Sequence, residues 1–140
     1  MNVLVDTSVW SLALRRRRQR QHDAVAELRE LIREGRVAIA GPIRQELLSG
    51  IRAVADYEAL KEDLRAFSDT ALTTEDYERA AACFNECRAA GIQGSNTDFL
   101  LCAVAERRGL AILTTDRDFL SYARVLPIAL HQPRPSAGRE

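Results

Sequence analysis

The chain has 140 residues, of which 46% are hydrophobic and 29% charged, and its 20 basic and 20 acidic side chains cancel at neutral pH. This length and hydrophobic content predict one globular domain with its own core and exclude a disordered chain. The balanced charge argues against a protein that coats nucleic acid with its whole surface, although it permits a basic edge beside an acidic site.

Short apolar runs alternate with helical patterns along the chain. The apolar runs predict strands at 2–5, 37–40, 110–113 and 125–128. The helical patterns predict helices over 9–14, 22–33, 42–50, 54–67, 74–90, 98–107 and 119–123. This alternation predicts an α/β fold with three α/β/α layers and a central parallel sheet. Residues 1–131 are expected to form the domain, and 132–140 a flexible tail.

Cysteine spacing and hydropathy indicate the compartment. Cys83, Cys87 and Cys102 are odd in number and contain no CxxC pair, which predicts reduced thiols rather than a disulfide framework. Cys83 and Cys87 are spaced i, i+4, as in some metal pairs, but without a second pair we expect them to be buried apolar side chains. No apolar run approaches the roughly 18 residues of a membrane span, and no signal-peptide pattern opens the chain. A cytoplasmic protein without a membrane partner is therefore expected.

Four acidic residues are expected at one edge of the predicted sheet. Asp6 and Asp116 end predicted strands, whereas Glu46 and Asp98 lie near the start of helices that follow a strand or loop. The carboxyl ends of parallel strands share one edge, where α/β folds bind ligands. Converging carboxylates repel one another unless a cation lies among them, and all-oxygen ligands favour Mg²⁺ or Mn²⁺ over zinc.

Such a cation can hold a water for attack on a phosphodiester and neutralise the charge that develops. The alternative is that each aspartate is an ordinary helix N-cap and Glu46 an exposed helix residue. The residue pattern alone leaves both interpretations open.

A run of arginines, Arg15, Arg16, Arg17 and Arg18, follows the first predicted helix. Its functional interpretation is contact with RNA phosphates, each of which releases counterions. Its alternative is a solvated helix end, where cations complement the helix dipole. The RNA interpretation is preferred slightly, because an acidic site needs cations nearby to hold a polyanion.

Four segments resemble the motifs of the PIN-domain family and occur in the family's order. They are residues 3–10 (VLVDTSVW), 42–50 (PIRQELLSG), 96–105 (NTDFLLCAVA) and 113–119 (LTTDRDF). The resemblance spans nearly the whole chain. Cys102 departs from the usual small aliphatic residue at its position, which affects packing rather than chemistry.

The resemblance to the VapC-type toxins of this family implies a Mg²⁺- or Mn²⁺-dependent endoribonuclease. By position, Asp6, Asp98 and Asp116 would bind the metal and, together with Glu46, form the catalytic acidic group. The residues assigned to support them are Thr7, Ser8, Thr115 and Asp118. The resemblance also implies an RNA substrate, a cognate antitoxin whose C-terminal segment lies along an apolar groove, and a homodimer or toxin–antitoxin hetero-oligomer.

Two other functions compete with the nuclease. A PIN-like module that binds RNA or a protein without cutting would be expected to lose metal ligands, yet all four acids are present. A phosphoryl-transfer enzyme of another doubly wound fold needs a second aspartate two residues after Asp6, where Ser8 stands, and the only lysine is Lys61. The nuclease hypothesis is therefore preferred.

Overall fold

A computed structural model describes residues 1–14 and 22–135 of the chain. In these residues, five parallel strands form one sheet in the order β3-β2-β1-β4-β5. The strands are β1 (Val3–Val5), β2 (Val37–Ala40), β3 (Asp69–Thr70), β4 (Ala111–Leu113) and β5 (Ala129–Leu130). The helices are α1 (Thr7–Leu14), α2 (Asp23–Arg33), α3 (Gly41–Leu48), α4 (Val54–Leu64), α5 (Thr74–Ala89), α6 (Asn96–Arg108) and α7 (Asp118–Tyr122).

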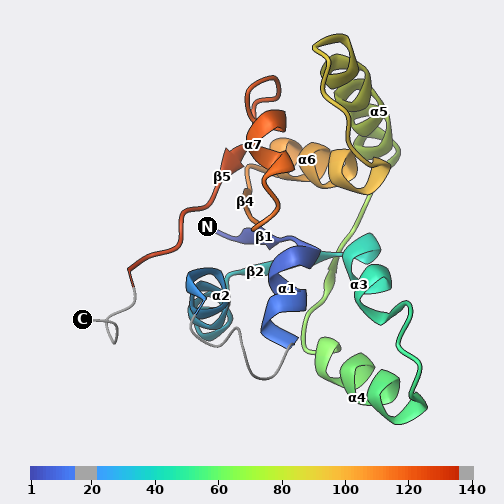
Figure 1. The fold of residues 1–140 in the computed structure, drawn as a ribbon, viewed down its shortest axis with the longest axis vertical. Coiled ribbons are helices and arrows are strands. Elements are labelled where there is room, and N and C mark those ends of the chain that lie inside the picture. The colour runs from blue at the N-terminus through green and yellow to red at the C-terminus, as the bar shows by residue number, and fades with distance from the viewer. Residues whose placement is uncertain (15–21, 136–140) are drawn as a thin grey trace.

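Helices lie on both sides of the sheet. Figure 1 shows α1 and α2 on one side and α5 and α6 on the other, with β1 and β2 between them. This arrangement confirms the predicted three-layer α/β/α fold with a parallel sheet. The strand order runs outward from β1 to β3 on one side and from β4 to β5 on the other. The order therefore reverses between β1 and β4, the place where open α/β sheets form ligand crevices.

The central strand explains why the chain adopts this sheet. Val3, Leu4 and Val5 are at most 1% exposed, as expected for a parallel strand covered on both faces. Val5 is paired in register with Leu113 of β4. The residues that follow these two strands, Asp6 and Thr114, are therefore brought side by side.

Of the helices that the structure describes, α6 has the most buried residues. Ser95 caps its start by accepting a hydrogen bond from the backbone N–H of Asp98 (3.0 Å), and Gly109 ends it in the left-handed conformation with φ 65°. Every residue from Phe99 to Ala105 is buried. The first turn of α6, which carries Asp98, is thus attached to a rigid core element.

Two details of the sheet differ from the sequence-based expectation. The strand predicted at 125–128 is wrong, because the backbone N–H groups of Val125 and Leu126 both bond to the carbonyl of Tyr122 and close α7. Pro127, which has no N–H group, follows, so the strand begins only at Ala129. Strand β3 was not predicted, because two polar residues carry no hydrophobic pattern.

The chain after β5 is attached to α2. Glu27 of α2 is 3% exposed and accepts hydrogen bonds from Arg134 (Nε to Oε2, 3.0 Å), and its Oε2 lies 2.6 Å from His131 Nε2. Arg134 therefore contacts the domain although it lies in the segment expected to be a tail. The domain boundary at residue 131 remains a prediction. Among the described residues, no helix combines the length and apolar character that crossing a membrane requires.

Replacing Glu27 with Gln is expected to lower the free energy of unfolding at pH 7 by about 2 kcal/mol, because the Arg134 guanidinium loses its buried carboxylate partner. Burial alone would raise the pKa of Glu27, but hydrogen bonds from Arg134 and His131 outweigh it and lower the pKa to about 2. A lowered folded-state pKa stabilises the protein above the ordinary value of about 4.5, and that stability is lost as pH falls toward 2.

Urea denaturation of the parent and the Glu27→Gln variant at pH 7 and pH 3 measures this effect. The difference in the free energy of unfolding between the parent and the variant should be smaller at pH 3 than at pH 7. An equal difference at both pH values would show that Glu27 acts through packing rather than charge.

Candidate active site

Asp6 lies directly after β1, and its side chain is fixed by two hydroxyl groups. It is 6% exposed, and its Oδ2 accepts hydrogen bonds from Ser8 Oγ (2.8 Å) and Thr114 Oγ1 (2.8 Å). Its carbonyl group accepts the N–H of Val9 (3.1 Å), in the first turn of α1. Burial and these contacts hold the Asp6 carboxylate in one orientation at the point where the strand order reverses.

The loop after β4 is tied to the same hydroxyl groups. The backbone N–H of Asp116 donates to Thr114 Oγ1 (2.9 Å), and that of Thr115 donates to Ser8 Oγ (3.0 Å). Thr114, rather than the expected Thr115, supplies the hydroxyl that reaches Asp6. The register of β1 and β4 explains this difference, because it places residue 114 beside residue 6.

Among the described residues, Asp98, Asp116 and Asp118 form a close group of acidic side chains. One carboxylate oxygen from each lies within 4.8 Å of the others. Asp116 Oδ1 also accepts the backbone N–H of Asp118 (2.9 Å), which fixes the loop at the start of α7. Asp118 was expected to support the site, but its carboxylate lies among the candidate cation ligands.

The electrostatics of Asp98 link this group to Asp6. Burial raises the pKa of Asp98 above its ordinary value, and the negative charges of Asp6 and Asp116 raise it further, against a hydrogen bond from Tyr122 that lowers it. Asp98 is therefore close enough to Asp6 and to Asp116 for their charges to act on it. A bound cation would relieve this repulsion.

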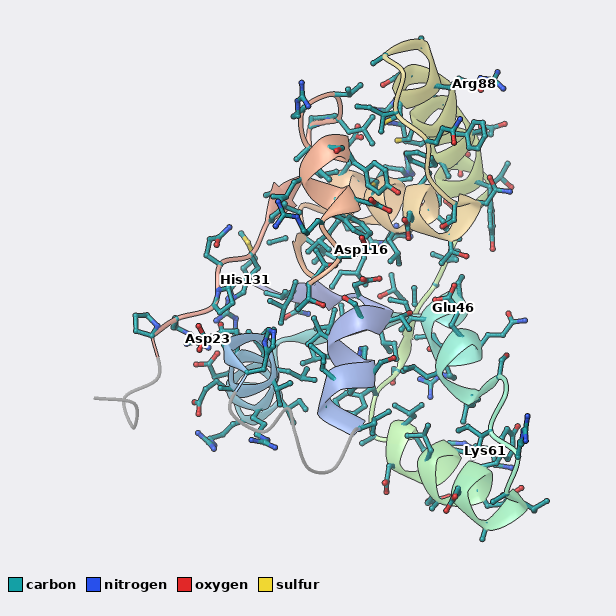
Figure 2. All side chains as sticks on the ribbon, viewed as in Figure 1. Asp23, Glu46, Lys61, Arg88, Asp116 and His131 are labelled. Atoms are coloured by element: carbon teal, nitrogen blue, oxygen red, sulfur yellow. The ribbon has the colours of Figure 1, made fainter. Side chains whose placement is uncertain are left out.

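Asp6, Asp98, Asp116 and Asp118 are called the acidic group below. Glu46 stands at the margin of this group. It is exposed on α3, and its Oε1 accepts a hydrogen bond from Thr7 Oγ1 (2.7 Å), next to Asp6 in the chain. Figure 2 labels Glu46 and Asp116 near the start of α1, on elements that follow β2 and β4. The structure thus brings Glu46 to the same edge of the sheet, but at its more open side.

The acidic side chains fit a small hard cation. Their donor atoms are all carboxylate oxygens, which Mg²⁺ and Mn²⁺ prefer. Two oxygens bound to Mg²⁺ at about 2.1 Å are at most about 4.2 Å apart. In the octahedral arrangement that Mg²⁺ requires, at most one pair of three ligand oxygens is that far apart, and the other pairs are about 3 Å apart. The oxygens of Asp98, Asp116 and Asp118, within 4.8 Å of one another, would each have to move by at most about 1 Å to share one ion.

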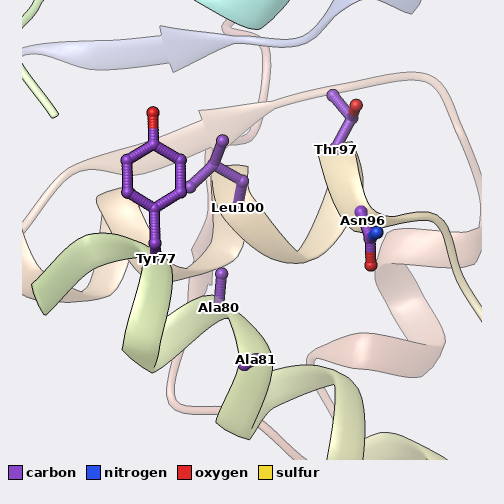
Figure 3. Close-up of a pocket in the computed structure, with 6 residues that line it drawn as sticks. All are labelled: Tyr77, Ala80, Ala81, Asn96, Thr97 and Leu100. Carbon is purple, nitrogen blue, oxygen red and sulfur yellow. The ribbon is translucent and has the colours of Figure 1, made fainter. Parts of the chain in front are cut away.

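A separate cavity of about 330 Å³ lies between α5 and the start of α6. Figure 3 shows Tyr77, Leu100 and Thr97 around it. The described residues that line it carry no charge, so it is not the place where a cation would bind. The acidic group, rather than this cavity, is the candidate catalytic centre.

Comparison with known families agrees with this arrangement. A family model described as "PIN domain" matches residues 3–125, which include all four acidic motifs. The chain belongs to the PIN-domain family. A PIN domain is therefore the structural unit that carries Asp6, Asp98 and Asp116 at the carboxyl edge of its sheet.

Relatives of this PIN domain include curated ribonucleases. The chain is 33% identical to VapC ribonuclease Mb1587 of Mycobacterium bovis and to ribonuclease VapC11 of Mycobacterium tuberculosis. In each case the match covers 88% of this chain and 92% of the relative. The similarity thus extends over nearly the whole of both proteins.

Solved structures share the fold at lower identity. A FitAcB structure from Neisseria gonorrhoeae has a TM-score of 0.75 at 22% identity, covering 94% of this chain and 97% of that one. A VapBC2 structure from Rickettsia felis, bound to a promoter DNA fragment, has a TM-score of 0.76 at 16% identity, covering 94% and 98%. A toxin–antitoxin complex from Klebsiella pneumoniae has a TM-score of 0.65 at 18% identity, covering 84% and 90%. These likenesses confirm the PIN fold.

Two residues of this PIN site were not predicted from the sequence. Thr114 and Tyr122 contact the acidic side chains directly, through hydrogen bonds to Asp6 and Asp98. Strand register could have indicated Thr114, but no sequence signal indicated Tyr122. The predicted RNA contacts, Arg15, Arg16, Arg17 and Arg18, lie outside the described residues.

Proposed function

We propose that this PIN domain is a divalent-cation-dependent endoribonuclease that hydrolyses RNA phosphodiester bonds as the toxin of a toxin–antitoxin pair. The observation that carries the proposal is the group of acids at the strand-order reversal, with oxygens of Asp98, Asp116 and Asp118 within 4.8 Å and Asp6 close enough to repel Asp98. The 33% identity to proteins named ribonuclease supports the same activity.

In this proposal the acids share the work at the site. Asp6, Asp98 and Asp116, joined by Asp118, hold Mg²⁺ or Mn²⁺, which would activate a water and neutralise charge on the phosphate. Glu46, at the exposed margin and held by Thr7, is placed to bind a water at the outer side of the site. Ser8 and Thr114 keep Asp6 in its orientation. The Arg15–Arg18 run is retained as the proposed contact to RNA phosphates.

The partner in this proposal is a cognate antitoxin. The expected assembly is a homodimer of this chain or a toxin–antitoxin hetero-oligomer. A cavity of about 660 Å³ at the end of α1 and along α4 supports it, because apolar Leu14, Ile51 and Leu60 line this cavity together with Asp56 and Asp63. Such a surface suits an amphipathic segment with apolar and basic side chains. We place the activity in the cytoplasm, where free thiols such as those of Cys83, Cys87 and Cys102 stay reduced.

Metal removal tests the proposal. The purified chain, treated with EDTA, is incubated with a mixed cellular RNA pool alone, with Mg²⁺ and with Mn²⁺, and the new RNA ends are sequenced. Cleavage at defined positions is expected with either cation and is expected to fall at least about 100-fold without one, because the carboxylates alone cannot neutralise the phosphate.

The matched controls separate this activity from contamination and from binding alone. An Asp6→Asn protein should lose the cleavage, whereas Glu78→Gln, which removes a negative charge from an exposed position on α5, should keep it. RNA binding without any cation-dependent cleavage would instead identify a non-cutting module, and saturable Mn²⁺ binding in titration calorimetry would be absent in that case.

A further inference from the structure

A tyrosine on α7 contacts the acidic group from inside the core. Tyr122 is 0% exposed, and its hydroxyl group donates a hydrogen bond to Asp98 Oδ2 (2.7 Å). It lies four residues after Asp118, on the same face of α7. Tyr122 thus contacts the acid on α6 from the helix that begins with Asp118.

The ring of Tyr122 has little freedom to move. It packs against Phe99 with ring centroids 4.9 Å apart and against Phe119 in an edge-on contact at 5.0 Å. Phe99 follows Asp98 on α6, and Phe119 follows Asp118 on α7. The same aromatic contacts that join the two helices therefore also fix the direction of the Tyr122 hydroxyl.

Gly94 provides the space that this hydroxyl occupies. A Cβ atom at position 94 would collide with Tyr122 Oη, would lie 2.8 Å from Tyr122 Cζ and would lie 2.9 Å from Phe99 Cζ. Contacts this short are not tolerated between carbon atoms, so a side chain at this position requires Tyr122 or Phe99 to shift. The glycine is required here by the close approach of the tyrosine.

We propose that Tyr122 is a positioning residue that gives the acidic group its preference for Mg²⁺ over Ca²⁺, by holding one oxygen of Asp98 and leaving the other for the cation. This inference rests on the cation site of the proposed function. Mg²⁺ requires a strict octahedral arrangement of ligands and takes one oxygen from a carboxylate. Ca²⁺ accepts more oxygens and often binds both oxygens of one carboxylate. A carboxylate with one oxygen already hydrogen-bonded suits the first ion better than the second.

Replacing Tyr122 with Phe tests this role, because it removes the hydroxyl and retains the packed ring. Dissociation constants for Mg²⁺ and for Ca²⁺ are measured by titration calorimetry on EDTA-treated protein without RNA. The Mg²⁺ constant is expected to rise about 10-fold, as for other outer contacts of metal ligands. The Ca²⁺ constant is expected to change little or to fall, so the Mg²⁺ preference should drop at least about fivefold.

Tyr57→Phe is the matched control, since it removes a tyrosine hydroxyl on α4, and it should leave both constants unchanged. Gly94→Ala is the second variant, because its new methyl group displaces the Tyr122 hydroxyl, and it should lower the Mg²⁺ preference in the same direction. Its loss of thermal stability should be smaller in the Tyr122→Phe background, where the closest colliding atom is gone.

The results separate the two proposals. If the parent binds neither ion, the cation site of the proposed function fails, and this inference fails with it. If the parent binds Mg²⁺ and the preference of both folded variants stays within about twofold of the parent, the role of Tyr122 is wrong while the nuclease proposal stands. If Tyr122→Phe does not fold, the preference measured for Gly94→Ala decides.

Discussion

Replacing Asp98 with Asn is expected to lower cation-dependent RNA cleavage at least about 100-fold while leaving the fold intact. Loss of a residue that only orients a metal ligand already costs about 10- to 100-fold in affinity or activity, and Asp98 is a proposed ligand itself. Its oxygen lies within 4.8 Å of oxygens of Asp116 and Asp118, so an amide there leaves the cation with one negative charge fewer.

The same substitution is expected to stabilise the metal-free protein. Burial and the charges of Asp6 and Asp116 raise the pKa of Asp98, which means that its ionised form is unfavourable without a cation. Removing that charge should raise the melting temperature by about 2–5 °C. Stabilisation is the usual effect of neutralising a carboxylate in an active site. Added Mn²⁺ should then stabilise the parent more than the variant, since only the parent binds it tightly.

Cleavage rates and melting curves with Mn²⁺ or EDTA measure both effects. Glu78→Gln, which also removes one negative charge on an exposed surface, should match the parent in both assays. An Asp98→Asn protein that cuts RNA at the parent rate would exclude Asp98 from the catalytic group.

Replacing Asp76 with Asn is expected to cause the largest loss of stability, about 3 kcal/mol or roughly 10 °C in melting temperature. Asp76 is 0% exposed at the start of α5, and it accepts hydrogen bonds from Arg107 (2.9 Å) and Arg108 (2.7 and 2.8 Å) at the end of α6. It also accepts the backbone N–H of Thr73 (2.8 Å) in a capping box. The amide leaves two guanidinium groups without their buried countercharge.

The pH dependence of this variant has a defined sign. Hydrogen bonds from Arg108, and then from Thr73 and Arg107, hold the pKa of Asp76 well below its ordinary range despite its burial. Its stabilising contribution is therefore complete above the unfolded-state pKa of about 3.9 and is lost progressively below it. The difference in the free energy of unfolding between the parent and the variant should be largest at pH 7 and smaller at pH 3.

Urea unfolding at these two pH values provides the measurement. Glu75→Gln, an exposed acid in the same first turn of α5, should change stability by less than about 0.5 kcal/mol. A similar small effect for Asp76→Asn would mean that the ion pairs with α6 do not hold the two helices together.

Much of the fold follows from local patterns in the sequence. The run from Val3 to Val5 is continuous and apolar, as expected for a strand buried on both faces, and Asp6 ends it. The alternation of such runs with helices requires a parallel sheet, and the sheet places Asp6, Glu46, Asp98 and Asp116 at one edge. Strand β3 consists of two polar residues and has no such pattern. It is a strand because it pairs with β2 rather than because of its own composition.

The sequence by itself therefore determined the α/β class, the order of most of the helices and strands, and the edge at which the acids gather, because periodicity and strand ends are local properties. Only the tertiary structure decided which atoms meet: Thr114 rather than Thr115 at Asp6, Asp118 beside Asp98, and Tyr122 donating to Asp98 from another helix. Those contacts depend on strand register and on how helices rotate as they pack. No short stretch of residues encodes either quantity.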